Sequence, residues 1–251
     1  MALYFIGLGL NNEKDITVNG LEAIKKCDLV YLENYTSILN CSKEDLDKFY
    51  GKKIILANRH MVEADDNYII RNAKTKNVAF LVIGDVFGAT THVDLLLRAK
   101  KEGIKTIIIH NSSILTAVGV TGLQLYKFGK TTSIPLDNDN VEAPYDVLKG
   151  NLSLGLHTLF LLDLNPDEEK FMSVNDAIRF LLRVELKRNE KIFSEKTLCV
   201  GCARIGSDNQ LIKAGTAKEL LKFDFGKPVH CLIVPGKMHF MEEEALGLYK
   251  L

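Results

Sequence analysis

The chain has 251 residues, 47% of them hydrophobic and 25% charged, which is enough to bury a substantial core in one large domain or two smaller ones. Its 32 basic and 32 acidic side chains cancel to a formal net charge of zero. A neutral chain has no bulk field that attracts nucleic acid or an anionic membrane, so we expect neither as a partner.

The N-terminal segment "MALYFIGLGL" is apolar, but it is too short to cross a bilayer and has no charged leader. We interpret it as a first buried strand. The five cysteines are an odd number and too sparse for a disulfide framework, so we expect free thiols and a cytoplasmic protein.

The first part of the chain alternates strand-like and helix-like segments. Strands are predicted for "LYFIGLGL", "DLVYLE", "KKIILA", "VAFLVIGD" and "KTIIIH". A helix-like pattern also lies near residues 65–75. Continuous Val, Ile and Leu strands between helices indicate a parallel sheet that is covered on both faces.

Two helices in this part have recognisable ends. In "ITVNGLEAIKKC", Thr17 is a plausible N-cap, and the hydrophobic side chains that we expect on one helical face are Val18, Leu21 and Ile24. The segment "THVDLLLRAKKEG" is predicted to be a helix that ends at Gly103.

Past about residue 112 the pattern changes to strands with fewer and longer connections. Strands are predicted in "TTSIPL", "LHTLFLLDL", "TLCVGCARIG" and "HCLIVPG", and helices over "VNDAIRFLLRVELKRNE" and "TAKELLKF". We therefore predict a two-lobe α/β protein: residues 1–112 form an N-terminal α/β domain with a parallel-type sheet, and residues 113–251 form a C-terminal α+β domain with a mixed sheet.

Ligands of open α/β sheets bind outside the carboxyl ends of the strands, and three such ends have chemically suitable residues. The first is "GLGL", which lacks the third glycine of a dinucleotide fingerprint because position 12 is Asn12. The second is "GDVFGATTH", where Thr91 can cap the next helix with Asp94 three residues on. Asp85 is either a ligand acceptor or a solvated turn carboxylate.

The third strand end is "HNSSI", where Ser112 and Ser113 either contact a polar ligand or cap the next helix. No serine-hydrolase elbow, Walker loop, H-E-x-x-H motif or EF-hand loop occurs in the sequence. His157 opens an apolar strand and is interpreted as a core-edge residue rather than a catalyst.

Cys199 and Cys202 form a C-x-x-C, which raises the alternative of a zinc site completed by His230 and Cys231. The motif lies inside a predicted strand and no second C-x-x-C follows, so we interpret these cysteines as buried structural thiols and assign no metal site.

Ten segments, in this order from end to end, resemble the diphthine synthase family of tetrapyrrole-methylase-like methyltransferases. They are "GLGL", "DITVNGLEAIKKCD", "YLENYTSIL", "GDVFGATTH", "HNSSI", "AVGVTGLQLYKFG", "LHTLFLLDL", "MSVNDA", "ARIGSDNQLIKAGT" and "DFGKPVHCLIVPGKMHFMEEEAL". The resemblance implies two α/β domains, a cleft between them for S-adenosylmethionine, release of S-adenosylhomocysteine, and a homodimer.

The resemblance also implies the substrate and the cofactor contacts. The substrate is translation elongation factor 2, on which a 3-amino-3-carboxypropyl-histidine is methylated repeatedly at its amino nitrogen during diphthamide biosynthesis. A fourth methyl group, added as a carboxylate ester, is left open. No catalytic residue is assigned. The cofactor-contacting positions carried over by motif are Leu10, Asp85, Gly88, Ser113, Ile114, Leu162, Ile205 and His230.

One departure and two alternatives accompany this resemblance. The family usually has proline after the aspartate, where this chain has Val86, and a proline there would fix φ. The first alternative keeps the fold and changes the substrate to a precorrin or uroporphyrinogen. The second is a non-catalytic protein that binds the elongation factor without transferring methyl groups.

Overall fold

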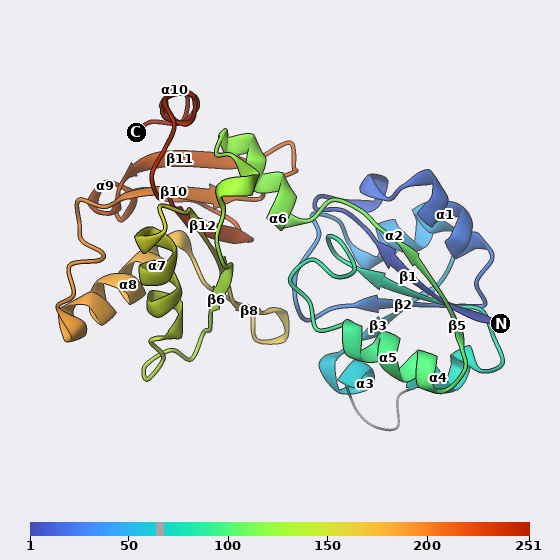
Figure 1. Ribbon diagram of the computed structural model, residues 1–251. Coiled ribbons are helices and arrows are strands. Elements are labelled where there is room, and N and C mark those ends of the chain that lie inside the picture. Colours follow the sequence, from blue (N-terminus) through green and yellow to red (C-terminus); the bar gives the residue numbers. More distant parts are fainter. Residues whose placement is uncertain (64–67) are drawn as a thin grey trace. The chain divides into compact units, whose positions relative to one another are not determined.

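The structure is a computed structural model that describes residues 1–63 and 68–251 (Figure 1). The chain divides into two compact units, Met1–Ala117 and Val118–Leu251. Across the described residues, none of the helices combines the length and the apolar character that a bilayer crossing requires.

The first unit is built on a five-stranded sheet with strand order β3-β2-β4-β1-β5, in which every pairing is parallel. The side chains of Leu3 and Phe5 point to one face and that of Ile6 to the other, and all three are fully buried. The strands are β1 (Ala2–Gly7), β2 (Leu29–Glu33), β3 (Ile54–Ala57), β4 (Val78–Val82) and β5 (Lys105–Ile109).

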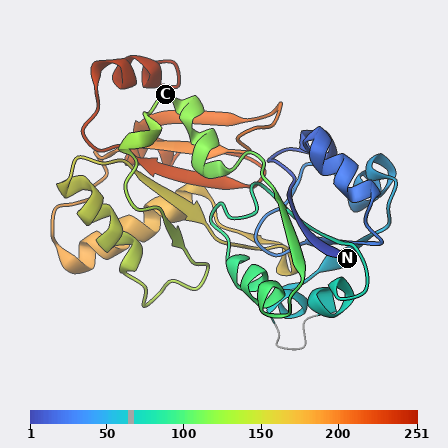
Figure 2. The ribbon, with the colours of Figure 1, turned by 45° about the vertical axis from the view of Figure 1, so that its right-hand side comes forward.

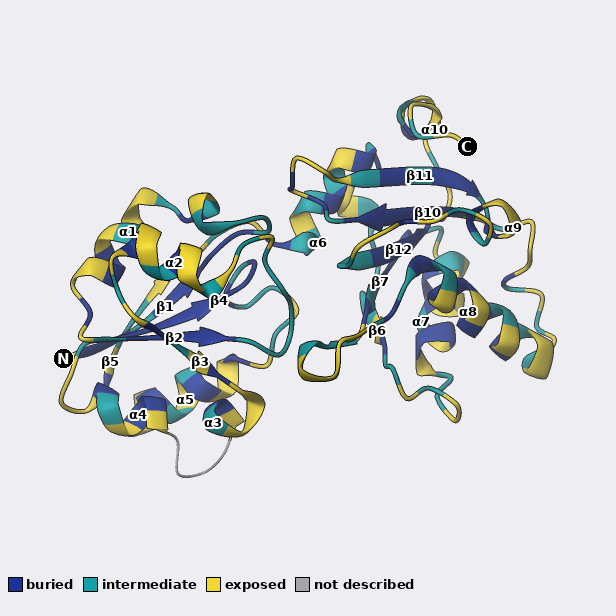
Figure 3. Ribbon diagram, turned by 180° about the vertical axis from the view of Figure 1, so that it is seen from behind, coloured by how far each residue is buried: buried dark blue, intermediate teal, exposed yellow. Residues whose placement is uncertain are grey.

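Helices cover both faces of this sheet, which confirms the predicted arrangement (Figure 1). The helices α1 (Val18–Lys25) and α2 (Lys43–Tyr50) pack on one face through Ile24 and Tyr50. The other face is covered by α3 (Arg59–Glu63), α4 (Tyr68–Ala73) and α5 (Val93–Lys101). Figure 3 shows the result as buried strands beneath helices whose outer surfaces are exposed.

The neighbouring strands β1 and β4 form a topological switch point. The chain leaves β1 through α1 to reach β2, and it leaves β4 through α5 to reach β5, so the two connections cross opposite faces of the sheet. Ligands of open α/β sheets commonly bind at such a point, outside the carboxyl ends of the strands. The loops that follow β1 and β4 contain "GLGL" and "GDVFG".

The second unit has a mixed five-stranded sheet, as predicted, with strand order β11-β10-β12-β7-β6. Only β6 and β7 pair in parallel. The strands are β6 (Thr132–Ile134), β7 (Thr158–Leu162), β10 (Leu198–Ala203), β11 (Leu211–Thr216) and β12 (His230–Val234), and β8 (Leu164–Asn165) and β9 (Lys170–Phe171) form a separate hairpin.

One core joins this sheet to three helices, α7 (Ala143–Ser153), α8 (Val174–Arg188) and α9 (Ala217–Leu220). Figure 2 shows α7 and α8 against the same face of the sheet. Ser173 caps α8 with a complete capping box to Asp176. The remaining helical segments among the described residues are α6 (Ile114–Ala117) in the first unit, α10 (Phe240–Gly247), and four 3-10 turns, Glu13–Asp15, Val118–Thr121, Leu125–Lys127 and Pro166–Glu168.

The helix ends mostly agree with the sequence, but one predicted face is wrong. Thr17 caps α1 by accepting a hydrogen bond from the Gly20 amide, and Gly103 follows α5 with a φ of +69°. Val18, however, is 75% exposed, because the buried face of α1 is centred on Gly20, Ala23 and Ile24, nearly half a turn away.

The helix-like pattern near residues 65–75 is confirmed from Tyr68 onward, where α4 begins. Residues 65–67 of that prediction lie outside the described residues.

Candidate functional site

The loops after β1 and β4 are joined by a pair of backbone hydrogen bonds between two glycines. The amide of Gly9 donates to the Gly84 carbonyl at 3.2 Å, and the amide of Gly84 donates to the Gly9 carbonyl at 2.7 Å. Both glycines have positive φ, +80° and +82°. A Cβ atom on Gly84 would meet nothing closer than Leu10 Cδ2 and the Ser112 carbonyl, each at 3.8 Å, so crowding does not require a glycine here and the positive φ does.

The Asp85 carboxylate connects the loop after β4 to the loop after β5. Its Oδ1 accepts from the Phe87 amide at 3.0 Å, while Oδ2 accepts from the Asn111 amide at 3.0 Å and lies 2.8 Å from His110 Nδ1. Burial alone would raise the pKa of Asp85, but these hydrogen bonds outweigh burial and lower it. Asp85 is therefore an anchored anion that stabilises its own turn and the next loop, and its role as a ligand acceptor stays a prediction.

Asn111 holds the loops after β1 and β5 together. Its side-chain amide donates to the Gly7 and Asp15 carbonyls, each at 3.0 Å, and its Oδ1 accepts from the Ser112 amide at 2.7 Å. The Asp15 carboxylate in turn accepts from the amides of Leu10 and Asn11. These bonds fix the backbone on both sides of the glycine pair.

The five site residues predicted in this unit lie together. Leu10 borders Gly84, as described above, and Gly88 packs so closely on Ser113 that any Cβ at Gly88 would collide with the serine hydroxyl. The Ser113 hydroxyl also accepts from the Leu115 amide, so it caps α6, whose first residue is Ile114. Both interpretations of this serine, helix cap and site residue, are compatible with the geometry.

The predicted capping role of Thr91 is wrong. The N-cap of α5 is His92, and it makes no side-chain capping bond, whereas the Thr91 hydroxyl donates to Glu63 at 3.4 Å. His92 is 99% buried, with Nδ1 3.3 Å from the Val86 carbonyl and its ring against Phe80. Burial lowers the pKa of His92, so the ring is neutral. The buried His92 therefore takes the N-cap position, and α5 begins one residue later than a Thr91 cap would place it.

Val86 stands where the resemblance leads one to expect proline. Its side chain is fully buried in the core beneath the sheet, and its carbonyl accepts from the Thr90 hydroxyl at 2.7 Å. The turn is therefore held by packing and by hydrogen bonds from the following residues.

In the second unit, the remaining predicted residues lie at one edge of the sheet. His230 begins β12 opposite Ala203 of β10, and Leu162 ends β7 on the other side of β12, one position past the paired Leu161 and Cys231. Ile205 follows Ala203 by two residues. Leu162 and Ile205 are both buried apolar residues at this edge.

The His230 ring has one nitrogen without a hydrogen-bond partner among the described residues. Nε2 lies 2.9 Å from the Lys227 carbonyl, and the ring packs on Phe225, whereas Nδ1 is buried and unpartnered. Burial lowers the pKa of His230, so the ring is neutral and Nδ1 carries a lone pair when Nε2 carries the hydrogen.

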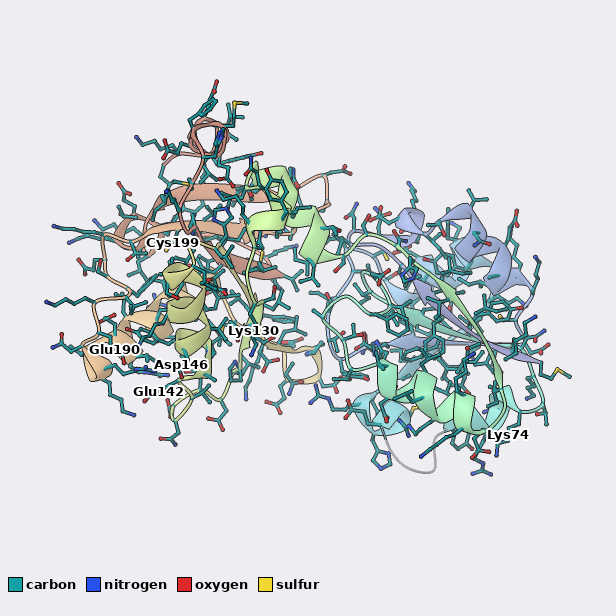
Figure 4. The ribbon with its side chains drawn as sticks, in the orientation of Figure 1. Lys74, Lys130, Glu142, Asp146, Glu190 and Cys199 are labelled. Carbon is teal, nitrogen blue, oxygen red and sulfur yellow. The ribbon has the colours of Figure 1, made fainter. Side chains whose placement is uncertain are left out.

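The two cysteines of the C-x-x-C in the zinc alternative point to opposite faces of strand β10. Cys199, labelled in Figure 4, belongs to the core against α7, α8 and α9, whereas Cys202 points to the opposite face and pairs with Cys231 across β10 and β12. Burial raises the pKa of the Cys199 thiol above its usual range. The two thiols of C-x-x-C therefore cannot bind one ion together.

His157 is a satisfied core residue, as predicted. Its ring is fully buried, with Nε2 2.9 Å from a Glu242 oxygen and Nδ1 accepting from the Gly236 amide at 2.9 Å. Burial lowers the pKa of His157.

Comparisons with known proteins identify the family. The family described as Tetrapyrrole (Corrin/Porphyrin) Methylases matches residues 2–221. A diphthine synthase of Methanosarcina mazei is 51% identical to this chain, over 97% of the chain and 94% of the relative. This chain belongs to the diphthine synthase family. As a member of that family it is a methyltransferase.

Other members of the diphthine synthase family support the same assignment. The diphthine methyl ester synthase of Homo sapiens is 46% identical over 99% of this chain and 95% of the relative. A crystal structure of diphthine synthase is 40% identical, with a TM-score of 0.92 that covers 100% of this chain and 96% of the other. The tetrapyrrole methylase alternative names only the broader family.

Three residues of the first-unit site were not predicted: Asp15, His110 and Asn111. His110 and Asn111 precede the serines of "HNSSI", so a strand end followed by two polar side chains was an available signal. Asp15 lies in the short 3-10 helix Glu13–Asp15, and nothing in its local sequence indicates that its carboxylate accepts two backbone amides.

Proposed function

We propose that this chain uses S-adenosylmethionine to methylate, repeatedly, the amino group of the 3-amino-3-carboxypropyl-histidine of translation elongation factor 2, the reaction that forms diphthine. The observation that carries the proposal is the end-to-end similarity to diphthine synthases and diphthine methyl ester synthases, with 46–51% identity over at least 97% of the chain.

We propose eight residues as contacts of S-adenosylmethionine. In the first unit these are Leu10, Asp85, Gly88, Ser113 and Ile114, and in the second they are Leu162, Ile205 and His230. Two observations support this assignment: Gly84 has a positive φ without close crowding, and Nδ1 of His230 has no hydrogen-bond partner among the described residues.

When bound, the cofactor supplies a methyl group on a positively charged sulfur. The sulfur leaves as a neutral thioether, so the leaving group needs no activation by the protein. The chain's own task is to bind and align. The glycine pair, Asp85 and Asn111 hold three loops in one fixed arrangement, and such orientation contributes about 7–11 kcal/mol to catalysis when the reacting atoms are well placed.

The test of this function is transfer of a labelled methyl group. The protein is incubated with labelled S-adenosylmethionine and with either elongation factor 2 bearing the precursor residue or a porphyrinogen. We expect label on the elongation factor only. Label on the tetrapyrrole alone would replace the proposed substrate, and saturable cofactor binding without any transfer would favour the non-catalytic alternative.

Three finer statements belong to the same proposal. Mass spectrometry of the modified histidine after a complete reaction separates three added methyl groups from a fourth one present as an ester. We also propose a homodimer, which sedimentation would detect as twice the chain mass of 28.1 kDa. Because its substrate is a translation factor, we place the protein in the cytoplasm.

A further inference from the structure

His110 and Asp85 form a hydrogen-bonded pair at the candidate site. His110 Nδ1 lies 2.8 Å from Asp85 Oδ2, and Asp85 is itself held by the amides of Phe87 and Asn111. An ionised carboxylate only accepts hydrogen bonds, so Nδ1 must carry the hydrogen. The neutral imidazole then has its lone pair on Nε2, on a side chain that is 69% exposed.

Repeated methylation of an amine requires a proton acceptor. An alkyl ammonium has no free electron pair, so each transfer to it must be preceded by loss of one proton. A trimethylated product therefore requires three proton losses from the starting ammonium ion. A histidine is suited to this role because a neutral imidazole accepts a proton on one ring nitrogen and can release it again as an imidazolium.

We propose that His110 is a catalytic residue that accepts these protons through Nε2, and that Asp85 is the positioning residue that fixes its ring. This rests on the proposed function. In each round Nε2 takes one proton from the substrate ammonium, and the amine electron pair forms the new C–N bond. The methyl–sulfur bond breaks, and its electron pair stays on sulfur, which becomes a neutral thioether.

The exposure of His110 allows it to act more than once. Between rounds the imidazolium must lose its proton, and an exposed ring can transfer that proton directly to water. The Asp85 carboxylate, with a side chain only 14% exposed, stabilises the imidazolium while it exists. Asp85 is the charged group that faces the ring within ion-pair distance among the described residues, and the Phe87 ring packs on its other side with centroids 6.4 Å apart.

The test compares His110→Gln with the exposed, matched control His60→Gln. Glutamine can keep the bond to Asp85 through its amide hydrogen but cannot accept a proton. At about pH 7 we expect His110→Gln to lower kcat by about 10²- to 10⁴-fold with unchanged affinity for S-adenosylmethionine, and His60→Gln to change neither. The defect should shrink as pH rises, because more of the substrate amine is then already deprotonated in solution.

Two further measurements do not depend on the kcat of the variant alone. Added imidazole should partly restore His110→Ala, which a purely structural role would not allow. Nitrogen-15 NMR of the wild-type protein should show neutral His110 protonated at Nδ1, and Asp85→Asn should abolish that preference. Hydrogen on Nε2 in the wild type would overturn the proposal.

The outcomes separate this inference from the proposed function. If the wild-type protein does not methylate the elongation factor, the proposed function is wrong. If the wild type is active and His110→Gln is equally active across the pH range, only the role of His110 is wrong. If an ester is formed, its rate should be unaffected in His110→Gln, since a carboxylate oxygen has no proton to lose.

Discussion

Gly9 and Gly84 hydrogen-bond to each other in both directions and both have left-handed backbone conformations, yet their missing side chains face different surroundings. A Cβ on Gly9 would lie 2.6 Å from Asp15 Cβ, whereas a Cβ on Gly84 would meet nothing within 3.8 Å. A side chain at Gly9 would therefore clash, whereas a Cβ at Gly84 would make only ordinary van der Waals contacts.

Alanine substitutions should distinguish these two glycines. Gly84→Ala should cost about 1–2 kcal/mol of unfolding free energy, the penalty of a left-handed alanine, and it should also weaken S-adenosylmethionine binding. Gly9→Ala should cost more, because it adds a clash. Gly103→Ala is the matched control, with positive φ and nothing within 4 Å, and it should lose stability without losing affinity. Equal affinity in Gly84→Ala and Gly103→Ala would contradict a ligand at Gly84.

Asn111 should not tolerate replacement by aspartate, despite the similar shape. Its amide group donates to two backbone carbonyls, and a carboxylate in its place would repel both. We expect Asn111→Asp to lower the free energy of unfolding by about 1–3 kcal/mol, the cost of leaving a buried acceptor unpaired. Thermal unfolding measures this, with exposed Asn140→Asp as the control. Equal melting temperatures of the two variants would mean that these bonds contribute little.

The parallel sheet could be predicted from the sequence because its signal is local. The β4 residues "VAFLV" are all apolar and all buried, so both faces of the strand are covered. Such a run can be recognised in the sequence without knowledge of the tertiary contacts. By contrast, β11 and α7 were not predicted. The β11 sequence "LIKAGT" is short of large apolar residues, and α7 contains Pro144 and Gly150, which weaken a helical pattern.

The site could be predicted in part. The three strand ends were recognised because glycine, aspartate and serine after an apolar run are informative by themselves. Contacts between loops could not be predicted, because Asn111 reaches Gly7 from a distant part of the chain. The capping role of Thr91 was wrong for the same reason: tertiary burial of His92 decides where α5 begins.

His230 should affect cofactor binding more than stability. Its Nδ1 is buried with no partner in the described part of the chain, while Nε2 is already satisfied by Lys227. His230→Phe keeps a ring against Phe225 but removes the acceptor, so we expect the affinity for S-adenosylmethionine to fall about 3- to 10-fold, the value of one hydrogen bond. Calorimetric titration measures this. An unchanged Kd would remove His230 from the proposed cofactor contacts.

Glu242 should make the second unit sensitive to acid. Its fully buried carboxylate accepts from the amides of Gln124 and His239 and pairs with Lys127 and His157. Burial alone would raise its pKa, but these partners lower the pKa from 4.5 to about 2. Because the folded pKa is lower than the unfolded one, the stabilisation is complete above pH 4.5 and is lost as pH falls toward about 2.

Glu242→Gln should remove that acid sensitivity and lower stability near neutral pH. Loss of one partner from a buried charge network costs about 3–5 kcal/mol, since Lys127 and His157 keep their places without the carboxylate. Urea unfolding, followed by circular dichroism from about pH 7 down to about pH 3, should show a flatter pH dependence than in the wild type. Glu243→Gln changes an exposed neighbour on the same helix and should behave like the wild type. A wild-type pH slope in Glu242→Gln would assign the acid sensitivity to other carboxylates.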